Sequence, residues 1–214
     1  MSHLFHDFKA EADHRIANNL ASLSSIVRLQ SNAIARDAKP FTAQQVCLLL
    51  KEVSARIEVT ARLHKLLAAS TNGEGVNLGS LLREICVMME AIAPAGMVVP
   101  SVACGCDTPI EPGFALSIGH IVAELITNAI KYAHPAGLPV KISISCRAEA
   151  GGLFVEVCDD GVGFPENFDP ATDGGLGFKL ISALARDAKL EVQFGHDCLG
   201  VCCRLIRQSL HLAS

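Results

Sequence analysis

The sequence predicts an α + α/β fold, in which a helical hairpin is followed by a two-layer α/β sandwich. Three observations indicate this fold class. Two long segments with apolar residues at helical spacing open the chain, a short polar stretch with two glycines follows them, and helical segments then alternate with strands. The chain has 214 residues and is 50% hydrophobic, which is enough for the cores of one large domain or two small ones.

The first two helices are predicted on either side of Lys39-Pro40, because proline ends a helix and Thr42 can cap the next one. Each helix has a seam of residues spaced three or four apart. The seams are Ile16, Leu20, Leu23 and Val27, then Val46, Leu50, Val53, Ile57 and Thr60. Two helices cannot enclose a core alone, so we expect an antiparallel hairpin that forms a four-helix bundle with a second copy, a homodimer.

Residues 71–75 are predicted to link this hairpin, domain 1–72, to a second domain, 73–214. The second domain should form the sandwich, with one face of its sheet covered by helices. Its helices are predicted over 78–91, 114–133 and 176–188, with a poorly defined extended region between the first two. Its strands are predicted around 142–146, 153–157, 190–194 and 201–205.

Charge and composition exclude several classes of partner. The net charge is only −4 and the basic residues are scattered, so no basic stripe exists to bind nucleic acid. The most apolar stretch, residues 91–103, is broken by proline and glycine and is too short to span about 30 Å of hydrocarbon. Because the first residues also lack a secretory pattern, we expect a cytoplasmic protein with no membrane contact.

Nine cysteines are dispersed along the chain. Their number is odd and no C-x-x-C pair occurs, which argues against a disulfide framework or a zinc site. We expect most of them to be small core residues. Strand alternation should point Cys202 and Cys203 to opposite faces of the sheet.

Three polar residues lie on one arc of the helix predicted over 114–133. Glu124, Asn128 and Lys131 stand at i, i+4 and i+7, opposite an apolar side. A solvated helix face would show the same pattern. The chemistry also suits a phosphate ligand, because Asn128 can offer an oxygen to Mg²⁺, Lys131 a charge to phosphates, and Glu124 a carboxylate to a metal-bound water.

Two glycine turns follow. Residues 159–163 read DDGVG after a strand, and residues 174–177 read GGLG before a helix. Glycine lets backbone amides approach a ligand closely, and a helix N-terminus offers free N–H groups to phosphate. The Asp159 carboxylate can accept from the exocyclic amine of adenine. The candidate nucleotide-binding residues here are Asp159, Gly161, Gly163, Gly175, Leu176 and Gly177.

In that order, "ELITNAIKYA", "DDGVGF" and "GGLGFKLI" resemble the asparagine box and the two glycine boxes of histidine-kinase ATP-binding domains. Hsp90-like, gyrase-like and MutL-like ATPases share this Bergerat-type fold. The resemblance implies ATP and Mg²⁺ as cofactors, with Asn128 as the metal ligand. Tyr132 would lie beside the base, as the tyrosine of other histidine kinases can. The short loop 164–173 predicts a minimal lid over the nucleotide.

The segment "EADHRIANNLASLSSIVRLQ" resembles the phosphoacceptor box of a sensor-kinase subfamily that reads approximately HRVKNNL and is related to the HWE kinases. That resemblance implies phosphorylation of His14. His14 lies opposite the apolar seam, so we expect it to be exposed. Glu11 and Asn18 flank it on the same face, and Glu11, with Asp13 as the alternative, would orient the imidazole or accept its proton.

Taken together, the resemblances imply a two-component histidine kinase that autophosphorylates His14 with Mg-ATP. The phosphate would pass to an aspartate of a response-regulator receiver domain. One alternative is a phosphorelay protein with a non-catalytic ATPase-like domain, and another is an ATPase that acts on a partner without phosphorylating histidine. Only thirteen residues precede His14, so we expect the signal to come from a separate sensor protein or from a segment outside this sequence.

Overall fold

The computed structural model describes residues 24, 27, 28, 31, 42–70, 75–105, 109–149, 152–195 and 199–208. The chain divides into two compact units, residues 1–64 and residues 65–214. Four of the five residues of the expected linker lie outside the described residues. The division into domains 1–72 and 73–214 therefore stays a prediction.

Helix α2 (Ala43–Ser70) begins at the predicted cap. The N–H of Gln45 donates to Oγ1 of Thr42 at 3.2 Å, and the N–H of Thr42 donates to Oε1 of Gln45 at 2.9 Å. This reciprocal pair is a capping box, which satisfies two amide groups that a helix end otherwise leaves open. Further along α2, three apolar seam residues stay exposed in the single chain: Val46, Leu50 and Ile57.

A short two-stranded sheet precedes the main one. Strand β1 (Val76–Asn77) pairs antiparallel with β3 (Pro109–Ile110). Asn77 then caps helix α3 (Leu78–Ile92), because its Oδ1 accepts from the N–H of Ser80 at 2.8 Å.

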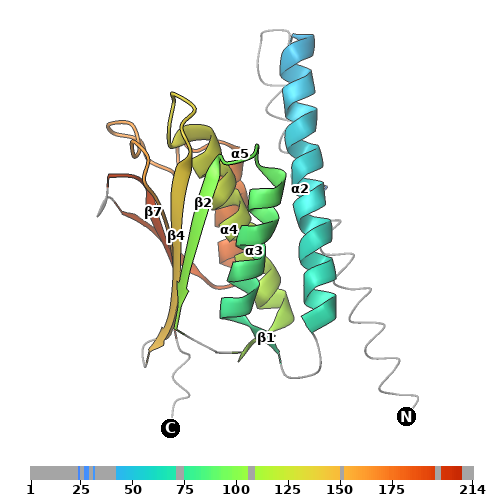
Figure 1. Ribbon diagram of the computed structural model, residues 1–214, viewed down its shortest axis with the longest axis vertical. Helices are drawn as coiled ribbons and strands as arrows, with labels where there is room; N and C mark the ends of the chain where they lie inside the picture. Colours follow the sequence, from blue (N-terminus) through green and yellow to red (C-terminus); the bar gives the residue numbers. More distant parts are fainter. Residues whose placement is uncertain are drawn as a thin grey trace, which may run out of the picture. The chain divides into compact units, whose positions relative to one another are not determined.

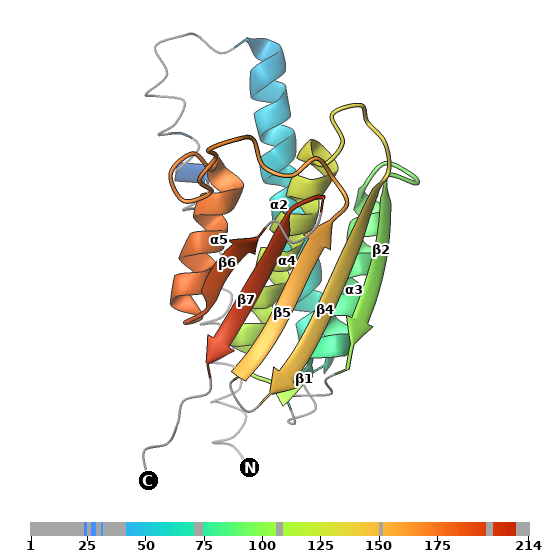
Figure 2. The ribbon, with the colours of Figure 1, turned by 90° about the vertical axis from the view of Figure 1, so that its left-hand side faces the viewer.

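The main sheet has five strands in the order β2-β4-β5-β7-β6, which can be followed across Figure 2. Strand β2 runs parallel to β4, and the other neighbours are antiparallel. The structure gives the strand bounds as β2 (Val98–Cys104), β4 (Val140–Glu149), β5 (Gly152–Asp159), β6 (Glu191–Gly195) and β7 (Cys202–Gln208). The sequence predicted four of these, and the extended region between α3 and α4 contains the fifth, β2.

Three helices cover one face of this sheet, as Figure 1 shows. They are α3, α4 (Pro112–Tyr132) and α5 (Leu176–Asp187). Helix α3 packs on β2, α4 on β4 and β5, and α5 on β6. The strand side chains under the helices are buried, among them Ile142, Ile144, Val155, Val157, Cys203 and Leu205. The predicted two-layer sandwich is therefore confirmed.

Helix α4 is the central element of the helical layer, in contact with both α3 and α5. Among the described helices, it is also the one whose length and composition would allow it to cross a membrane. Most of its apolar stretch is buried inside the domain, as is usual for the core helix of a sandwich.

Within the described residues, two disulfides join neighbouring strands, and the sequence did not predict them. Cys104 in β2 is bonded to Cys146 in β4, and Cys158 in β5 to Cys202 in β7. The expectation that most cysteines are small core residues was therefore wrong for these four. It holds for two buried free thiols, Cys86 and Cys203. Burial, with Glu90 as a second cause for Cys86, raises their pKa values to about 11 and about 12.

Candidate functional site

The polar arc of α4 runs from the protein interior to its surface. Glu124 is buried, at 5% exposure, Asn128 is half-buried, and Lys131 is exposed. The first turn of α5 covers the inner part of the arc. A Cβ added at Gly177 would lie 3.1 Å from Oε2 of Glu124 and 3.2 Å from Oδ1 of Asn128. The alternative of a solvated helix face is therefore wrong for Glu124.

Asn128 has an unsatisfied polar group. Its Nδ2 is buried and has no hydrogen-bond partner among the described residues. Buried polar atoms rarely lack a partner in a native fold, so a water, an ion or a ligand group would complete the hydrogen bonding of this atom. An amide side chain next to a helix N-terminus suits phosphate oxygens and a hard cation such as Mg²⁺. The residues present therefore fit a metal-bound nucleotide.

The first glycine turn is attached to the end of α4. A Cβ at Gly161 would come 2.5 Å from the Cα and Cβ of Ala133, so only glycine fits there without displacing the helix end. The N–H of Val162 donates to the carbonyl of Ala133 at 2.9 Å. Gly163 has φ +76°, a left-handed conformation that also favours glycine.

Asp159 is held at the start of this turn. Its Oδ1 accepts from the N–H of Gly161 at 2.9 Å and from the N–H of Val201 at 3.2 Å. The second carboxylate oxygen, Oδ2, has no hydrogen bond within the described part of the chain, so it can accept from a ligand amine. Asp159 thus has the fixed orientation that its predicted contact with adenine requires.

His134, just after the end of α4, and Asp160, in the turn, form a contact that sequence reasoning missed. Nε2 of His134 lies 3.0 Å from Oδ1 of Asp160, which also accepts from the N–H of Lys141 at 2.8 Å. Partial burial of the Asp160 carboxyl raises its pKa, but these hydrogen bonds outweigh it and hold the pKa below the usual 3.8. His134 and Asp160 are 26 residues apart, and no spacing rule connects them.

The second glycine turn presents an open helix end. Gly175 is the N-cap of α5, no side chain caps the helix there, and a Cβ at Gly175 would meet nothing within 4 Å. Leu176 and Gly177 form the start of the first turn, where backbone N–H groups lack helical partners and the dipole favours negative charge. This end of α5 adjoins Asn128 through Gly177, as described above.

An aromatic cluster fixes the loop between the two turns. Phe164 stacks on Phe168 with ring centroids 5.1 Å apart. Both rings also contact Phe178 of α5, at 5.9 and 6.0 Å, and Phe164 contacts Phe194 of β6 at 5.8 Å. The loop 164–173, which the sequence predicted as a short lid, is therefore packed through its phenylalanines against α5 and β6.

The structure brings together the two glycine turns and the α4 arc, with α4 contacting both turns. Tyr132, in the last turn of α4, is 65% exposed and free to contact a flat ligand. The predicted phosphoacceptor His14 and its neighbours Glu11 and Asn18 lie outside the described residues.

Two family models match the chain. The model described as histidine kinase matches residues 11–92, and the model of the histidine kinase-, DNA gyrase B- and HSP90-like ATPase matches residues 113–205.

Curated relatives cover nearly the same span. The chain is 29% identical over 190 residues to the sensor histidine kinase PdtaS of Mycobacterium tuberculosis, an alignment covering 86% of this chain and 35% of that protein. It is 29% identical over 189 residues to blue-light-activated histidine kinase 2 of Erythrobacter litoralis, covering 86% and 51%. The chain thus spans between about a third and a half of the length of these relatives.

The fold is also similar to a solved structure. The blue-light activated histidine kinase of Erythrobacter litoralis superposes with a TM-score of 0.71 at 24% sequence identity. The match covers 92% of this chain and 57% of that one.

Proposed function

We propose that this chain is a histidine kinase that binds Mg-ATP and phosphorylates its own His14, because a histidine kinase model matches residues 11–92 and a model of histidine kinase-, DNA gyrase B- and HSP90-like ATPases matches residues 113–205. The observation that carries the proposal is the unpartnered Nδ2 of Asn128 beside the uncapped N-terminus of α5. A buried amide next to free helix N–H groups is a place where a phosphate chain would be bound.

The described residues have distinct roles in this proposal. Oδ2 of Asp159 accepts from the adenine amine, while Oδ1 stays bonded to Gly161 and Val201. Tyr132 lies beside the base, and Lys131 and the start of α5 face the phosphates. Asn128 would hold Mg²⁺, and the Glu124 carboxylate would hold a metal-bound water. The ion supplies positive charge that offsets the charge of the phosphate oxygens.

His14 is the nucleophile. Its neutral imidazole nitrogen forms a bond to the γ-phosphorus as the bond to the bridging oxygen breaks and ADP leaves. In this proposal Glu11 holds the other ring nitrogen and accepts its proton, and Asn18 is the second polar residue that the sequence spacing predicts on the same face as His14. The protein's contribution is mainly to position these groups. The phosphate then moves to an aspartate of a response-regulator receiver domain.

A second copy of the chain completes the helical bundle. The exposed apolar residues along α2, Val46, Leu50 and Ile57, support this, because such a row is costly to leave in water. We place the protein in the cytoplasm, where ATP and receiver domains are present.

Incubation with ATP labelled at the γ-phosphate tests the proposal. The chain should take up label that acid releases and alkali does not, as expected for phosphohistidine. His14→Gln should take up none while keeping its affinity for ADP. Asn128→Ala should also lose labelling from ATP, yet should still accept phosphate in reverse from a phosphorylated receiver domain.

Two results would overturn this proposal. Label on the His14→Gln protein would exclude His14 as the acceptor. A wild-type chain that takes no label from ATP, while it and Asn128→Ala exchange phosphate equally well with a receiver domain, would make it a phosphorelay protein instead.

A further inference from the structure

The Cys158–Cys202 disulfide lies on the open face of the sheet. The two residues are directly opposite each other in β5 and β7, with their Cα atoms 4.1 Å apart. Their neighbours Val157 and Cys203 point the other way and are buried under the helices. Because side chains alternate along a strand, the disulfide is on the uncovered side, where both cysteines are half-buried.

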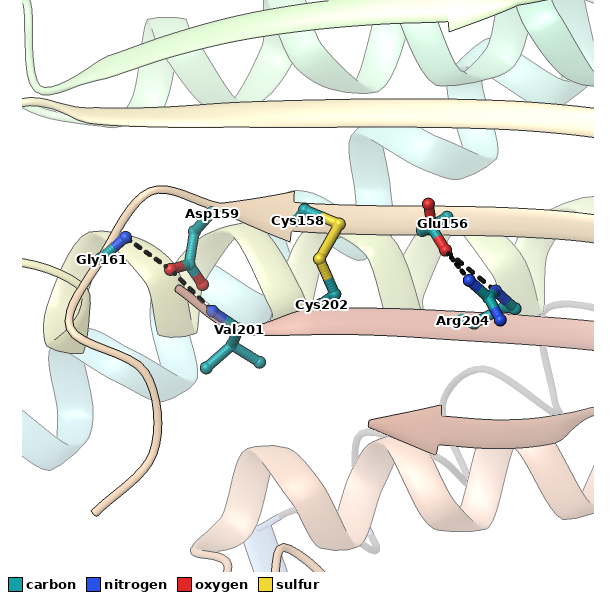
Figure 3. Close-up of a disulfide and its surroundings, with 7 residues drawn as sticks. All are labelled: Glu156, Cys158, Asp159, Gly161, Val201, Cys202 and Arg204. Carbon is teal, nitrogen blue, oxygen red and sulfur yellow. Dashed lines mark hydrogen bonds and ion pairs between the residues drawn. A yellow bond between two sulfur atoms is a disulfide. The ribbon is translucent and has the colours of Figure 1, made fainter. Parts of the chain in front are cut away.

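Next to the disulfide, as Figure 3 shows, Asp159 follows Cys158 and Val201 precedes Cys202, and Asp159 belongs to the candidate nucleotide site. The N–H of Asp159 donates to the carbonyl of Val201 at 3.0 Å, and the N–H of Val201 donates back to Oδ1 of Asp159 at 3.2 Å. Gly200 is packed so closely that an added Cβ would overlap the backbone oxygen and Oδ1 of Asp159. The segment just before Cys202 therefore sets the position of the Asp159 carboxylate.

The disulfide is well placed to hold that segment. Strand β7 begins at Cys202, and the ends of strands open more readily than their centres. On the far side of the disulfide, Arg204 pairs with Glu156 of β5, with Nε 2.9 Å from Oε2. That ion pair keeps the two strands in register away from the site. At the site itself, the bond between Cys158 and Cys202 is the covalent anchor for Val201.

We propose that Cys158 and Cys202 are positioning residues for the nucleotide site, and that the bond between them makes affinity for adenine nucleotides depend on the thiol redox state of the protein. The inference rests on the proposed function, since it requires Asp159 to contact adenine. With the bond formed, Val201 stays against Oδ1 and the site is preorganised. With the bond reduced, the start of β7 opens more often and affinity falls.

The chemistry is a two-electron exchange with a dithiol reductant. One thiolate of the reductant attacks a sulfur of the bond and forms a mixed disulfide, releasing one cysteine as a thiolate. The second thiol of the reductant then displaces the other cysteine. Two electrons and two protons pass to the protein, which has two thiols, and the reductant becomes a disulfide. Disulfides are rare in cytosolic proteins, and those that do form there are usually catalytic or redox-sensing.

The second disulfide is a matched control in the same sheet. Cys146 is buried on the helix-covered face, next to β2, and Cys104 lies close to Gly79 at the start of α3. In the register of β4 and β5, Ile142 is opposite Asp159, and Cys146 is two side chains further along the same face. Reduction of the Cys104–Cys146 bond should therefore not move the Asp159 carboxylate.

Calorimetric titration of the full chain with ADP tests the inference, on oxidised protein and on protein reduced with dithiothreitol. Alkylation and peptide mapping confirm the state of each cysteine. The wild-type chain should lose about five- to tenfold in affinity on reduction, the loss expected when one well-placed hydrogen bond is no longer held. Cys104→Ser/Cys146→Ser should keep this redox effect. Cys158→Ser/Cys202→Ser should bind like reduced wild type under both conditions.

Three results would overturn the inference. They are equal affinity of the oxidised and reduced wild-type chain, a redox effect that persists in Cys158→Ser/Cys202→Ser, and mapping that finds no Cys158–Cys202 bond under oxidation. If the Cys158→Ser/Cys202→Ser chain does not fold, wild type and Cys104→Ser/Cys146→Ser still test the inference. Both should lose the same affinity for ADP on reduction. A chain that binds no ADP in either state refutes the proposed function instead, and the inference with it.

Discussion

Gly177 leaves almost no space beside Asn128: a Cβ at position 177 would lie 3.2 Å from Oδ1 of the asparagine. The same Cβ would be 3.1 Å from Oε2 of Glu124. The start of α5 and the polar arc of α4 are therefore in contact through a residue that has no side chain. This contact joins the second glycine turn to the metal-binding residue proposed above.

Gly177→Ala should weaken ADP binding about tenfold, because the new methyl group pushes Asn128 or Glu124 from its position, a cost of about 1 to 2 kcal/mol. Calorimetry measures the affinity. Gly113→Ala is the matched control, since a Cβ there meets nothing within 4 Å and Gly113 is at the opposite end of α4 from the candidate site. Equal losses in the two variants would mean that the crowding at Gly177 is not what matters.

Asp159→Asn should weaken adenine nucleotides more than inorganic triphosphate. The asparagine oxygen can still accept from the N–H groups of Gly161 and Val201. The NH₂ group, however, takes the place of Oδ2 and presents a donor to the amine of the base. The loss for ADP should be about 2 kcal/mol. Asp160→Asn, one residue along, is the control and should change both affinities little. Similar losses for both ligands would place Asp159 away from the base.

Stability should depend on the ionisation of Asp160. Its folded-state pKa is below 3.8, so as the pH falls the unfolded chain takes up the proton first. The stabilisation from its charge is complete above the unfolded value and disappears as the pH falls through the folded value. Urea unfolding should therefore show a difference between wild type and Asp160→Asn that is present at about pH 5 and shrinks as the pH falls further. A stability difference that does not change with pH would mean that the charge of Asp160 does not stabilise the fold.

Leu50→Glu should convert a dimer into a monomer. Leu50 is 61% exposed in the single chain, in the predicted seam of α2, and a charge there would be buried against the second copy. Light scattering at micromolar concentration should give twice the chain mass for wild type and the single mass for the variant. Ala55→Glu, on another side of α2, should remain dimeric. A monomeric wild-type chain would exclude the homodimer.

Much of the sandwich could be predicted, because α4, α5 and most strands have strong local patterns of apolar residues. Strand β2 could not, since Pro100 interrupts it and it pairs with β4 in parallel from the edge of the sheet. The disulfides were missed for a related reason. Their cysteines are 42 and 44 residues apart, and only the strand register brings them together.

The candidate site was predicted as residue types on helices and turns, and the structure adds how they are held. The spacing of Glu124, Asn128 and Lys131 gave their shared face, but not the burial of Glu124, which depends on α5. The pair formed by His134 and Asp160 had no signal in the sequence. It depends on where the turn after β5 meets the end of α4, which local periodicity does not encode.

Tyr132 has a practical consequence for optical measurements. It is the chain's one tyrosine, and the chain has no tryptophan. Its near-ultraviolet emission therefore comes almost entirely from a single ring, at the end of α4 beside the candidate site. A ligand that stacks on this ring should quench the emission, so nucleotide can be titrated by intrinsic fluorescence without a dye. Inner-filter correction for the absorbance of adenine would be the main precaution, and inorganic triphosphate, which has no ring, provides the blank.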